Sequence, residues 1–283
     1  MEYQDTRTLV STGWLSRHLE DPDLRILDGS WHLPEAGRDG RDEYDREHIP
    51  GARFFDINEI ADTECGLPHM APTPEKFMSR MREMGIGDGH QVVVYDGAGI
   101  FSAARVWWLF RYMGHFDVAV LDGGLPRWKR EGHPVVDMPP AAGVRHMTAR
   151  LQGHLVTDAD RVARASQSGD ALILDARPAA RYRGEAPEPR PGLEKGHIPG
   201  SVNLPFDTLL NDDGTFRSPD ELSDLLAGVG VNSTTPVISS CGSGVTASMI
   251  DLALEVTGHR RHAVYDGSWA EWGLGGHGPI ETG

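Results

Sequence analysis

The sequence predicts an α/β protein of two tandem domains, each a parallel sheet flanked by helices. Two observations predict this fold class: an internal repeat, and short β-branched runs that alternate with segments of helical periodicity. The chain has 283 residues, more than a single hydrophobic core usually holds, so two domains of ordinary size are expected. An apolar content of 39% is sufficient for both cores.

The repeat consists of four elements that recur in the same order in the two halves of the chain. Their offsets are nearly constant, at 147, 149, 145 and 144 residues, which indicates that one domain has been duplicated. The paired segments are 24–28 with 171–175, 48–51 with 197–200, 92–96 with 237–241, and 121–124 with 265–268.

Within each half, a strand is followed by a helix. The apolar run 92–95 precedes a helical pattern over 102–113, and the run 236–240 precedes one over 247–256. Such βαβ units form parallel sheets, with functional loops at the carboxyl ends of the strands. A turn-rich stretch with five prolines and glycines, Pro134 to Gly153, separates the halves. We therefore predict domains over 1–140 and 154–283, joined by a linker over 141–153.

The composition excludes several classes of partner. Lys plus Arg is 27 and Asp plus Glu is 42, a net charge of −15 that argues against nucleic acid or anionic membranes as partners. Two cysteines without zinc-ligand spacing suggest neither a disulfide framework nor a metal site. Residues 1–9 are polar, and no window approaches eighteen apolar residues. We expect a cytoplasmic protein with no metal and no membrane segment.

Cys241 is the candidate nucleophile. It ends the strand 236–240 and begins a loop with two glycines, Gly242 and Gly244, that leads into a helix. Loop amides and the positive end of a helix favour an anion and lower the pKa of a cysteine thiol. A buried structural cysteine is the alternative, but the strand, loop and helix context favours a nucleophile. The matching loop of the first half has Asp96 in this position and carries no thiol, so the first domain is predicted to be non-catalytic.

The run Cys-Gly-Ser-Gly-Val-Thr-Ala at 241–247 resembles the active-site loop of the 3-mercaptopyruvate sulfurtransferases, in the tandem-rhodanese family, and the resemblance covers nearly the whole chain. It implies a non-catalytic and a catalytic rhodanese-like domain, in that order, with an active site in the cleft between them. It further implies that Cys241 forms a persulfide with sulfur from 3-mercaptopyruvate and passes it to cyanide or to a thiol acceptor such as thioredoxin. No metal or organic cofactor is implied.

The family pattern also implies a substrate clamp. Arg181 and Arg190 match the arginines that hold the carboxylate and carbonyl of mercaptopyruvate, in a segment that three prolines stiffen. A guanidinium group binds a carboxylate through two parallel hydrogen bonds, which lysine does not match. The alternative role for both arginines is in surface salt bridges with Glu185 and Glu188, which contribute little stability.

The loop after Cys241 has further implied roles. Its amides are expected to bind the persulfide, and Ser243 to pass or accept a proton. Thiosulfate-using rhodaneses have basic residues here, so a neutral loop favours a monoanionic 2-oxo acid thiol over thiosulfate. The remaining residues expected to contact substrate sulfur are Gly242, Gly244, Val245 and Thr246.

The family's proton relay includes a first-domain histidine before a methionine, which is His69 in this chain. The relay's carboxylate, eleven residues earlier, is replaced by Asn58, which cannot stabilise an imidazolium as a carboxylate does. Asp56, Glu59 and Asp62 are the alternatives, and an ordinary loop histidine remains an equally good explanation of His69.

Other notable residues are expected to be structural. His48 and His197 lie in the repeated His-Ile-Pro-Gly turns of both domains, where a side-chain hydrogen bond across the turn explains them. Cys65 has no helix field of its own, and Arg177 and Arg183 are expected on solvated faces. Core packing is expected for four tryptophans, Trp107, Trp108, Trp269 and Trp272.

Three rival functions stay open at this point. A thiosulfate sulfurtransferase is the nearest, and a rhodanese-like sulfur carrier or binding module without turnover is another. A cysteine phosphatase needs an arginine six residues after its cysteine, where this chain has Ala247.

Overall fold

The computed structural model describes residues 7–141 and 143–283, which form two α/β units. The first unit comprises Met1–Ala61, Pro72–Gln152 and Asn211–Phe216, and the second comprises Asp62–Ala71, Gly153–Leu210 and Arg217–Gly283. Each unit therefore includes one short segment from the opposite half of the sequence.

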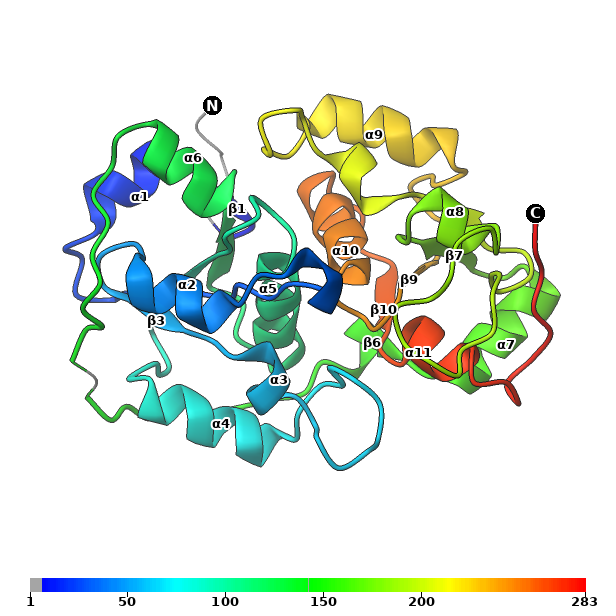
Figure 1. Cartoon of the computed structure of the whole chain (residues 1–283), viewed down its shortest axis with the longest axis horizontal. Coiled ribbons are helices and arrows are strands. Elements are labelled where there is room, and N and C mark those ends of the chain that lie inside the picture. Colours follow the sequence, from blue (N-terminus) through cyan, green and yellow to red (C-terminus); the bar gives the residue numbers. More distant parts are fainter. Residues whose placement is uncertain (1–6, 142) are drawn as a thin grey trace. The chain divides into compact units, whose positions relative to one another are not determined.

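Each unit contains a five-stranded sheet in which all neighbouring strands are parallel, and the strand order is the same in both (Figure 1). The predicted duplication of a parallel α/β domain is thus confirmed. The first sheet has the order β1-β5-β4-β2-β3, with bounds β1 Leu9–Val10, β2 Leu24–Asp28, β3 Ala52–Phe54, β4 Gln91–Tyr95 and β5 Val118–Leu121. The second has the order β6-β10-β9-β7-β8, with bounds β6 Val156–Thr157, β7 Leu172–Asp175, β8 Val202–Asn203, β9 Val237–Ser240 and β10 His262–Tyr265.

Several helices begin at a residue whose side chain caps the first turn. Asp158 caps α7 by accepting the N–H of Arg161, and Ser218 forms a capping box with Glu221 at the start of α9. The α-helices of the first unit are α1 Thr12–His18, α2 Gly40–Arg46, α3 Ile57–Ile60, α4 Pro74–Glu83, α5 Ala103–Tyr112 and α6 Gly124–Arg130. Those of the second are α7 Ala159–Ser168, α8 Ala179–Tyr182, α9 Pro219–Gly228, α10 Ala247–Val256 and α11 Ser268–Trp272. Single turns of 3-10 helix occupy Pro34–Ala36, Gly153–Leu155 and Phe206–Leu209.

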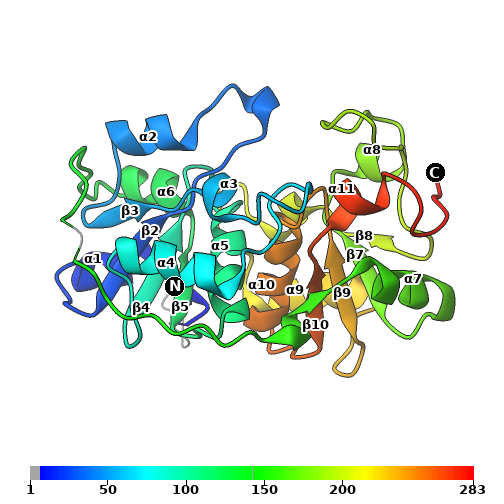
Figure 2. The same cartoon turned by 90° about the horizontal axis from the view of Figure 1, so that it is seen from below.

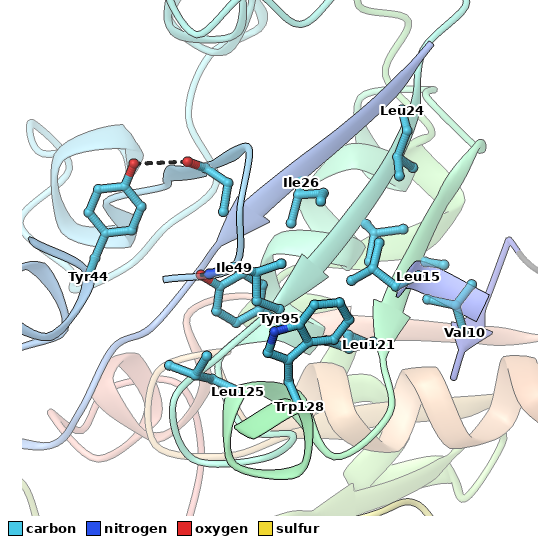
Figure 3. Close-up of a cluster of buried hydrophobic side chains, with 13 residues drawn as sticks. Val10, Leu15, Leu24, Ile26, Tyr44, Ile49, Tyr95, Leu121, Leu125 and Trp128 are labelled. Atoms are coloured by element: carbon cyan, nitrogen blue, oxygen red, sulfur yellow. Dashed lines mark hydrogen bonds between the residues drawn. The ribbon is translucent and has the colours of Figure 1, made fainter. Parts of the chain in front are cut away.

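One face of the first sheet forms a hydrophobic core with α1, α2 and α6 (Figure 3). Alternate strand residues such as Val93 and Tyr95 point into it, because side chains of a strand alternate between faces. The three polar side-chain groups of this core have hydrogen-bond partners. The Tyr44 hydroxyl donates to the Ala52 carbonyl at 2.9 Å, the Tyr95 hydroxyl accepts the N–H of Ile49 at 3.2 Å, and the Trp128 indole donates to the Pro134 carbonyl at 2.7 Å. The helix α5 packs against β4 and β5.

The second sheet is covered in the same way. Residues of α7 and α11, including Val162, Trp269 and Trp272, pack with Ile173 and Ile238 in one core. In Figure 2, α7 lies beside β7 on the side of the sheet away from α10. The four tryptophans expected in cores are all buried, at no more than 1% exposure. The core of each unit thus fixes the strand that leads into the candidate loop, β4 or β9.

Candidate active site

Cys241 follows β9 directly, and its loop leads into α10, as the sequence predicts. The residue is only 1% exposed. Gly244 has a φ of 77°, a backbone conformation that glycine adopts without strain, and it allows the loop to curl before the helix. The cysteine is therefore held at the carboxyl end of a central strand, where parallel α/β sheets place their functional loops.

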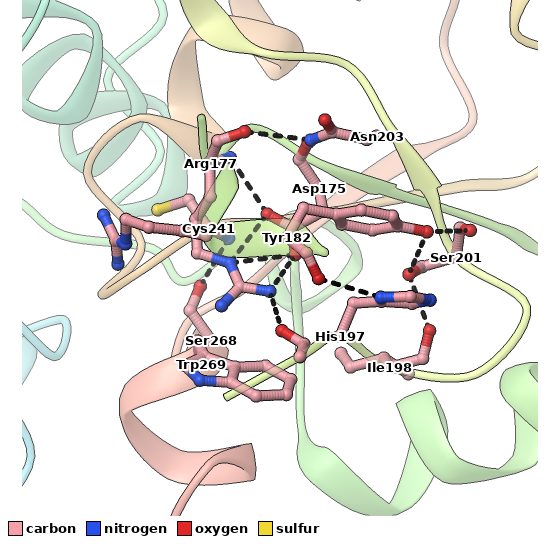
Figure 4. Close-up of polar contacts among 12 residues, drawn as sticks. Asp175, Arg177, Tyr182, His197, Ile198, Ser201, Asn203, Cys241, Ser268 and Trp269 are labelled. Carbon is pink, nitrogen blue, oxygen red and sulfur yellow. Dashed lines mark hydrogen bonds and ion pairs between the residues drawn. The ribbon is translucent and has the colours of Figure 1, made fainter. Parts of the chain in front are cut away.

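The Cys241 loop is fixed by the turn after β10 and by the start of α11. The Ser268 hydroxyl accepts the N–H of Cys241 at 3.2 Å (Figure 4). It also accepts the N–H of Gly244 at 3.1 Å and donates to the Tyr265 carbonyl at 2.8 Å. The carbonyl of Cys241 in turn accepts the N–H of Trp269 at 2.9 Å. Ser268 was not among the predicted site residues. The repeat offers a signal for it, because the matching residue of the first half is Gly124.

Both predicted clamp arginines converge on the residue after the cysteine. A Cβ atom built on Gly242 would lie 3.1 Å from Nη2 of Arg181 and 3.9 Å from Nη1 of Arg190. A side chain at position 242 would therefore occupy the space in front of the two guanidinium groups. The structure therefore places the guanidinium groups of Arg181 and Arg190 next to the residue that follows the buried Cys241.

Glu188 connects the clamp to a buried ion-pair network. Its carboxylate is 2% exposed and is shared between Arg181 and Arg177, with an Oε1 to Nη1 distance of 2.9 Å for the latter. Arg181 therefore pairs with Glu188 in a largely buried ion pair, and not in the surface salt bridge that was its alternative predicted role. Glu188, in the segment 183–192, thus holds the guanidinium group of Arg181 in place.

The expectation that Arg177 lies on a solvated face is wrong. Its side chain is 0% exposed, forms an ion pair with Asp175 at 2.7 Å, and stacks over Trp269 with 4.2 Å from Cζ to the ring centroid (Figure 4). Burial works against its charge, but Asp175 and Glu188 outweigh burial and raise the pKa of Arg177. Two buried carboxylates require a buried cation, and this requirement overrides the usual exposure of arginine. Arg183, as expected, is exposed and pairs with Glu185.

The Ser243 hydroxyl contacts two other predicted site residues, His69 and Arg190. Ser243 is 4% exposed, and its Oγ lies 2.9 Å from Nδ1 of His69. Arg190 Nη2 donates to the same oxygen at 3.3 Å. His69 belongs to the short segment 62–71 of the second unit, and it has a φ of 61°, which is uncommon for a residue other than glycine. The structure therefore brings His69 and Ser243 into contact.

The three alternative carboxylates have local partners. Asp56 caps α3 by accepting the N–H groups of Asn58 and Glu59, the latter at 3.0 Å. Glu59 forms an ion pair with Arg80 at 2.7 Å, and Asp62 accepts the N–H of Glu64 at 2.9 Å. Asp56 thus caps a helix, Glu59 belongs to an ion pair, and Asp62 stabilises a turn of its own segment.

The paired histidines of the His-Ile-Pro-Gly turns are structural, as expected. His48 Nδ1 contacts the Tyr44 carbonyl at 2.7 Å, and its ring stacks on the Tyr44 ring. His197 repeats the arrangement with Tyr182, at 2.9 Å from the carbonyl. Cys65 is exposed, and its thiol faces the carbonyl groups of its own loop.

The matching loop of the first unit is built around a carboxylate. Asp96 Oδ1 accepts the N–H of Ala98 at 2.9 Å, and its Oδ2 accepts those of Phe101 at 2.7 Å and Ala103 at 2.8 Å. Arg38 lies over Gly97 as Arg181 lies over Gly242, and its Nε donates to Glu43 at 2.6 Å. The loop that lacks a thiol therefore encloses an internal anion.

Among residues 7–141 and 143–283, no group of three or more His, Cys, Asp or Glu side chains is arranged to hold a metal ion. In the same part of the chain, no helix is both long enough and apolar enough to span a membrane.

Comparison with known proteins places the chain in context. A family model described as "Rhodanese-like domain" matches residues 11–131 and 158–274. The 3-mercaptopyruvate sulfurtransferase of Escherichia coli (strain K12) is 40% identical over 281 residues, covering 98% of both chains. The thiosulfate sulfurtransferase of Rattus norvegicus is 43% identical over 273 residues, covering 94% of this chain and 92% of that protein. The crystal structure of SseA from Escherichia coli, described as a 3-mercaptopyruvate sulfotransferase, has a TM-score of 0.85 and 38% identity, covering 93% of this chain and 99% of that chain.

Proposed function

Because this chain belongs to the rhodanese family, with two rhodanese-like domains in tandem, we propose that it is a sulfurtransferase that takes sulfur from 3-mercaptopyruvate. The observation that supports this most directly is the convergence of Arg181 and Arg190 in front of Gly242, one residue after Cys241. Two guanidinium groups next to a thiol suit a substrate that presents a carboxylate and a sulfur atom together.

In the proposed first half-reaction, the Cys241 thiolate attacks the sulfur of 3-mercaptopyruvate. The new S–S bond leaves a persulfide on Cys241, the C–S bond breaks, and its electron pair leaves with the organic fragment as the enolate of pyruvate. A proton then adds to the methylene carbon. In the second half-reaction, a thiol acceptor such as thioredoxin, or cyanide in an assay, attacks the outer sulfur and restores the Cys241 thiolate. Ping-pong kinetics are expected for such covalent catalysis.

The loop amides and the two arginines have separate roles in this proposal. The amides of Gly242, Ser243, Val245 and Thr246 are expected to stabilise the negative charge on the sulfur, whereas the Gly244 amide donates to the Ser268 hydroxyl. Arg181 and Arg190 bind the carboxylate and carbonyl, and so hold the substrate sulfur in line with Cys241.

We assign the proton transfer to Ser243, with His69 as the group that receives or returns the proton through the 2.9 Å contact. Ser243→Ala should lower kcat about 100-fold, the low end of general acid catalysis, with little change in KM. Ser240→Ala is a matched control, because the buried Ser240 hydroxyl has no hydrogen-bond partner among the described residues. Equal losses in both variants would contradict the assignment.

Intact-mass spectrometry tests the scheme. After incubation with 3-mercaptopyruvate and removal of excess donor, the protein should gain the mass of one sulfur atom, and Cys241→Ser should not. Cys65→Ser, which removes the exposed second thiol, should still gain it. An unchanged mass in the wild-type protein would refute the proposal.

A second candidate is thiosulfate sulfurtransferase activity, which the 43% identity to the rat enzyme favours. The neutral Gly242 and Ser243, in place of basic residues, favour a monoanionic donor instead. The ratio of kcat/KM for the two donors decides between them. Steady-state release of pyruvate distinguishes either enzyme from a sulfur carrier without turnover.

The acceptor and the compartment are part of the proposal. Two free cysteines and an acidic surface are consistent with a reducing compartment such as the cytoplasm and with a protein thiol such as thioredoxin as acceptor. Transfer from the isotopically labelled persulfide to reduced thioredoxin, followed by mass spectrometry, tests the acceptor, and cell fractionation tests the compartment.

A further inference from the structure

The turn 266–268, which follows β10, contacts both segments that form the candidate site. Asp266 Oδ2 accepts the N–H of Ala71 at 2.7 Å, two residues after His69. Ser268 Oγ accepts the N–H groups of Cys241 and Gly244, at 3.2 and 3.1 Å. We propose that this turn is the positioning element of the site: Asp266 fixes the His69 segment, Ser268 fixes the Cys241 loop, and together they align the two at Ser243. The proposal deepens, and rests on, the proposed function.

The backbone of Ser268 supports a specific role for its hydroxyl. Ser268 is fully buried and has a φ of 50°, a conformation that strains residues other than glycine. The matching residue of the first unit, Gly124, has a φ of 53°. Both units keep the backbone contact from the next residue, since Leu125 donates to the Asp96 carbonyl as Trp269 donates to that of Cys241. Only the unit with the cysteine has a hydroxyl at the strained position.

Asp266 also has a counterpart in the first unit. Asp122 Oδ1 accepts the N–H of Phe216 at 2.8 Å, in the segment 211–216 that the first unit receives from the opposite half of the sequence. Each unit thus binds a segment through an aspartate after its last central strand, but only the segment held by Asp266 includes a candidate site residue. His69 itself has a positive φ, and such a residue keeps its conformation only where neighbouring contacts fix it.

Ser268→Gly tests whether the Ser268 hydroxyl fixes the Cys241 loop. The variant introduces no backbone strain, because glycine accepts the positive φ. We expect the rate of Cys241 alkylation by iodoacetamide at pH 7, followed by peptide mass spectrometry, to fall about 10- to 100-fold, the effect of a misplacement near 1 Å. The thermal midpoint should stay close to that of the wild type. Ser268→Ala should be less stable than Ser268→Gly and equally slow. A wild-type alkylation rate in Ser268→Gly would overturn the positioning role of Ser268.

The alkylation readout requires no substrate. A wild-type protein that forms no persulfide from 3-mercaptopyruvate, yet shows the Ser268 effect on alkylation, would refute the proposed function and leave the positioning role intact.

Asp266→Ala tests whether Asp266 fixes the segment that contains His69, and Asp122→Ala is the matched control. Hydrogen exchange of peptides covering 62–71 should become at least about 10-fold faster in Asp266→Ala, and that of peptides covering 211–216 in Asp122→Ala. Asp266→Asn, which keeps an acceptor oxygen, should restore most of the protection. Only Asp266→Ala should lower kcat with KM unchanged, and adding it to His69→Ala should cause no further loss. Three results would each overturn the positioning role of Asp266: unchanged hydrogen exchange in 62–71, additive losses of kcat in the double variant, or an equal loss of kcat in Asp122→Ala.

Discussion

The loops at 96–103 and 241–248 occupy matching positions in the two units, but their backbone N–H groups have different acceptors. In the first, the amides of Ala98, Phe101 and Ala103 all donate to the Asp96 carboxylate, so the anion is part of the loop. In the second, Cys241 replaces the carboxylate, and the Ser268 hydroxyl accepts loop amides from outside. A built-in anion makes the first loop a closed structural element, whereas a sulfur atom can accept a second sulfur and return to its starting state.

The helices that follow these loops, α5 and α10, also differ in the side chains at matching positions. At the fifth and ninth positions, α5 has Trp107 and Arg111, while α10 has Asp251 and Glu255. In the second unit both carboxylates face the buried His262, with ion-pair distances of 2.9 and 3.2 Å. The first unit is thus stabilised here by aromatic packing, and the second by buried charge.

The largest expected effect separates the two loops. Cys241→Ser should reduce sulfur transfer at least about 1000-fold, because the covalent intermediate cannot form. Asp96→Asn should keep kcat within twofold but destabilise the protein by about 1.5–3 kcal/mol, the value of hydrogen bonds to a charged group. Steady-state assays and denaturant titration measure the two quantities. Loss of turnover in Asp96→Asn at full stability would contradict a purely structural role for the first loop.

The strand ends provide a second contrast. Asp175 accepts the N–H of Arg177 and pairs with its guanidinium, whereas Asp28 accepts the N–H of Ser30, at the same distance of 2.9 Å. Burial, which hydrogen bonds from Ser30 and Tyr95 only partly offset, raises the pKa of Asp28 to about 6.

The two Asp-to-Asn variants should therefore have opposite effects on stability at pH 7. Asp175→Asn should destabilise by about 3–5 kcal/mol, as expected when a buried pair is broken. Asp28→Asn should stabilise by about 1–3 kcal/mol, because wild-type stability falls as the pH rises from the unfolded value, near 4, through about 6. Denaturant titrations at pH 4 and pH 7 measure both. The gain in Asp28→Asn should vanish at the lower pH, and a gain that persists there would contradict the titration of Asp28.

The buried imidazolium of the second unit predicts a loss of stability at alkaline pH. Burial opposes its charge, but Asp251 and Glu255 prevail and raise the pKa of His262 to about 9. The stabilisation is complete below the ordinary histidine value of 6.5 and disappears as the pH rises through about 9, a loss of up to about 3 kcal/mol.

Unfolding free energies between pH 6 and pH 10 test this effect. His262→Gln should be less stable than the wild type at pH 6 and should show a flatter profile. His154→Gln, which alters an exposed histidine, should follow the wild type. Parallel profiles for wild type and His262→Gln would show that another group titrates.

The smallest expected effect distinguishes the arginines of the two units. Arg181→Lys and Arg190→Lys should raise KM for 3-mercaptopyruvate about 10- to 100-fold, because lysine cannot present two parallel N–H groups. Arg38→Lys, at the matching place over Gly97, should leave KM unchanged. Initial-rate kinetics with varied donor measure this, and a similar rise in Arg38→Lys would mean that the first unit takes part in substrate binding.

The sequence predicted the features that are local or repeated. The offsets near 145 residues indicated the duplicated sheet, and the glycines around Cys241 indicated its loop. The role of Arg177 could not be predicted, because the burial of an arginine depends on carboxylates that only the fold brings to it. Ser268 was detectable in principle by aligning the halves, where it replaces Gly124, but its strained backbone and its amide contacts are tertiary features.

The exchange of short segments has a consequence for how the polypeptide can be divided. The second unit includes residues 62–71, which precede residue 153, although the rest of that unit follows it. The first unit includes residues 211–216, which follow residue 153, although the rest of that unit precedes it. During synthesis, the first unit remains incomplete until the ribosome has passed well beyond it. A fragment starting at the second repeat would also lack His69 and the amide that Asp266 binds. A cut between the two repeats would therefore leave each unit without one of the segments that it includes.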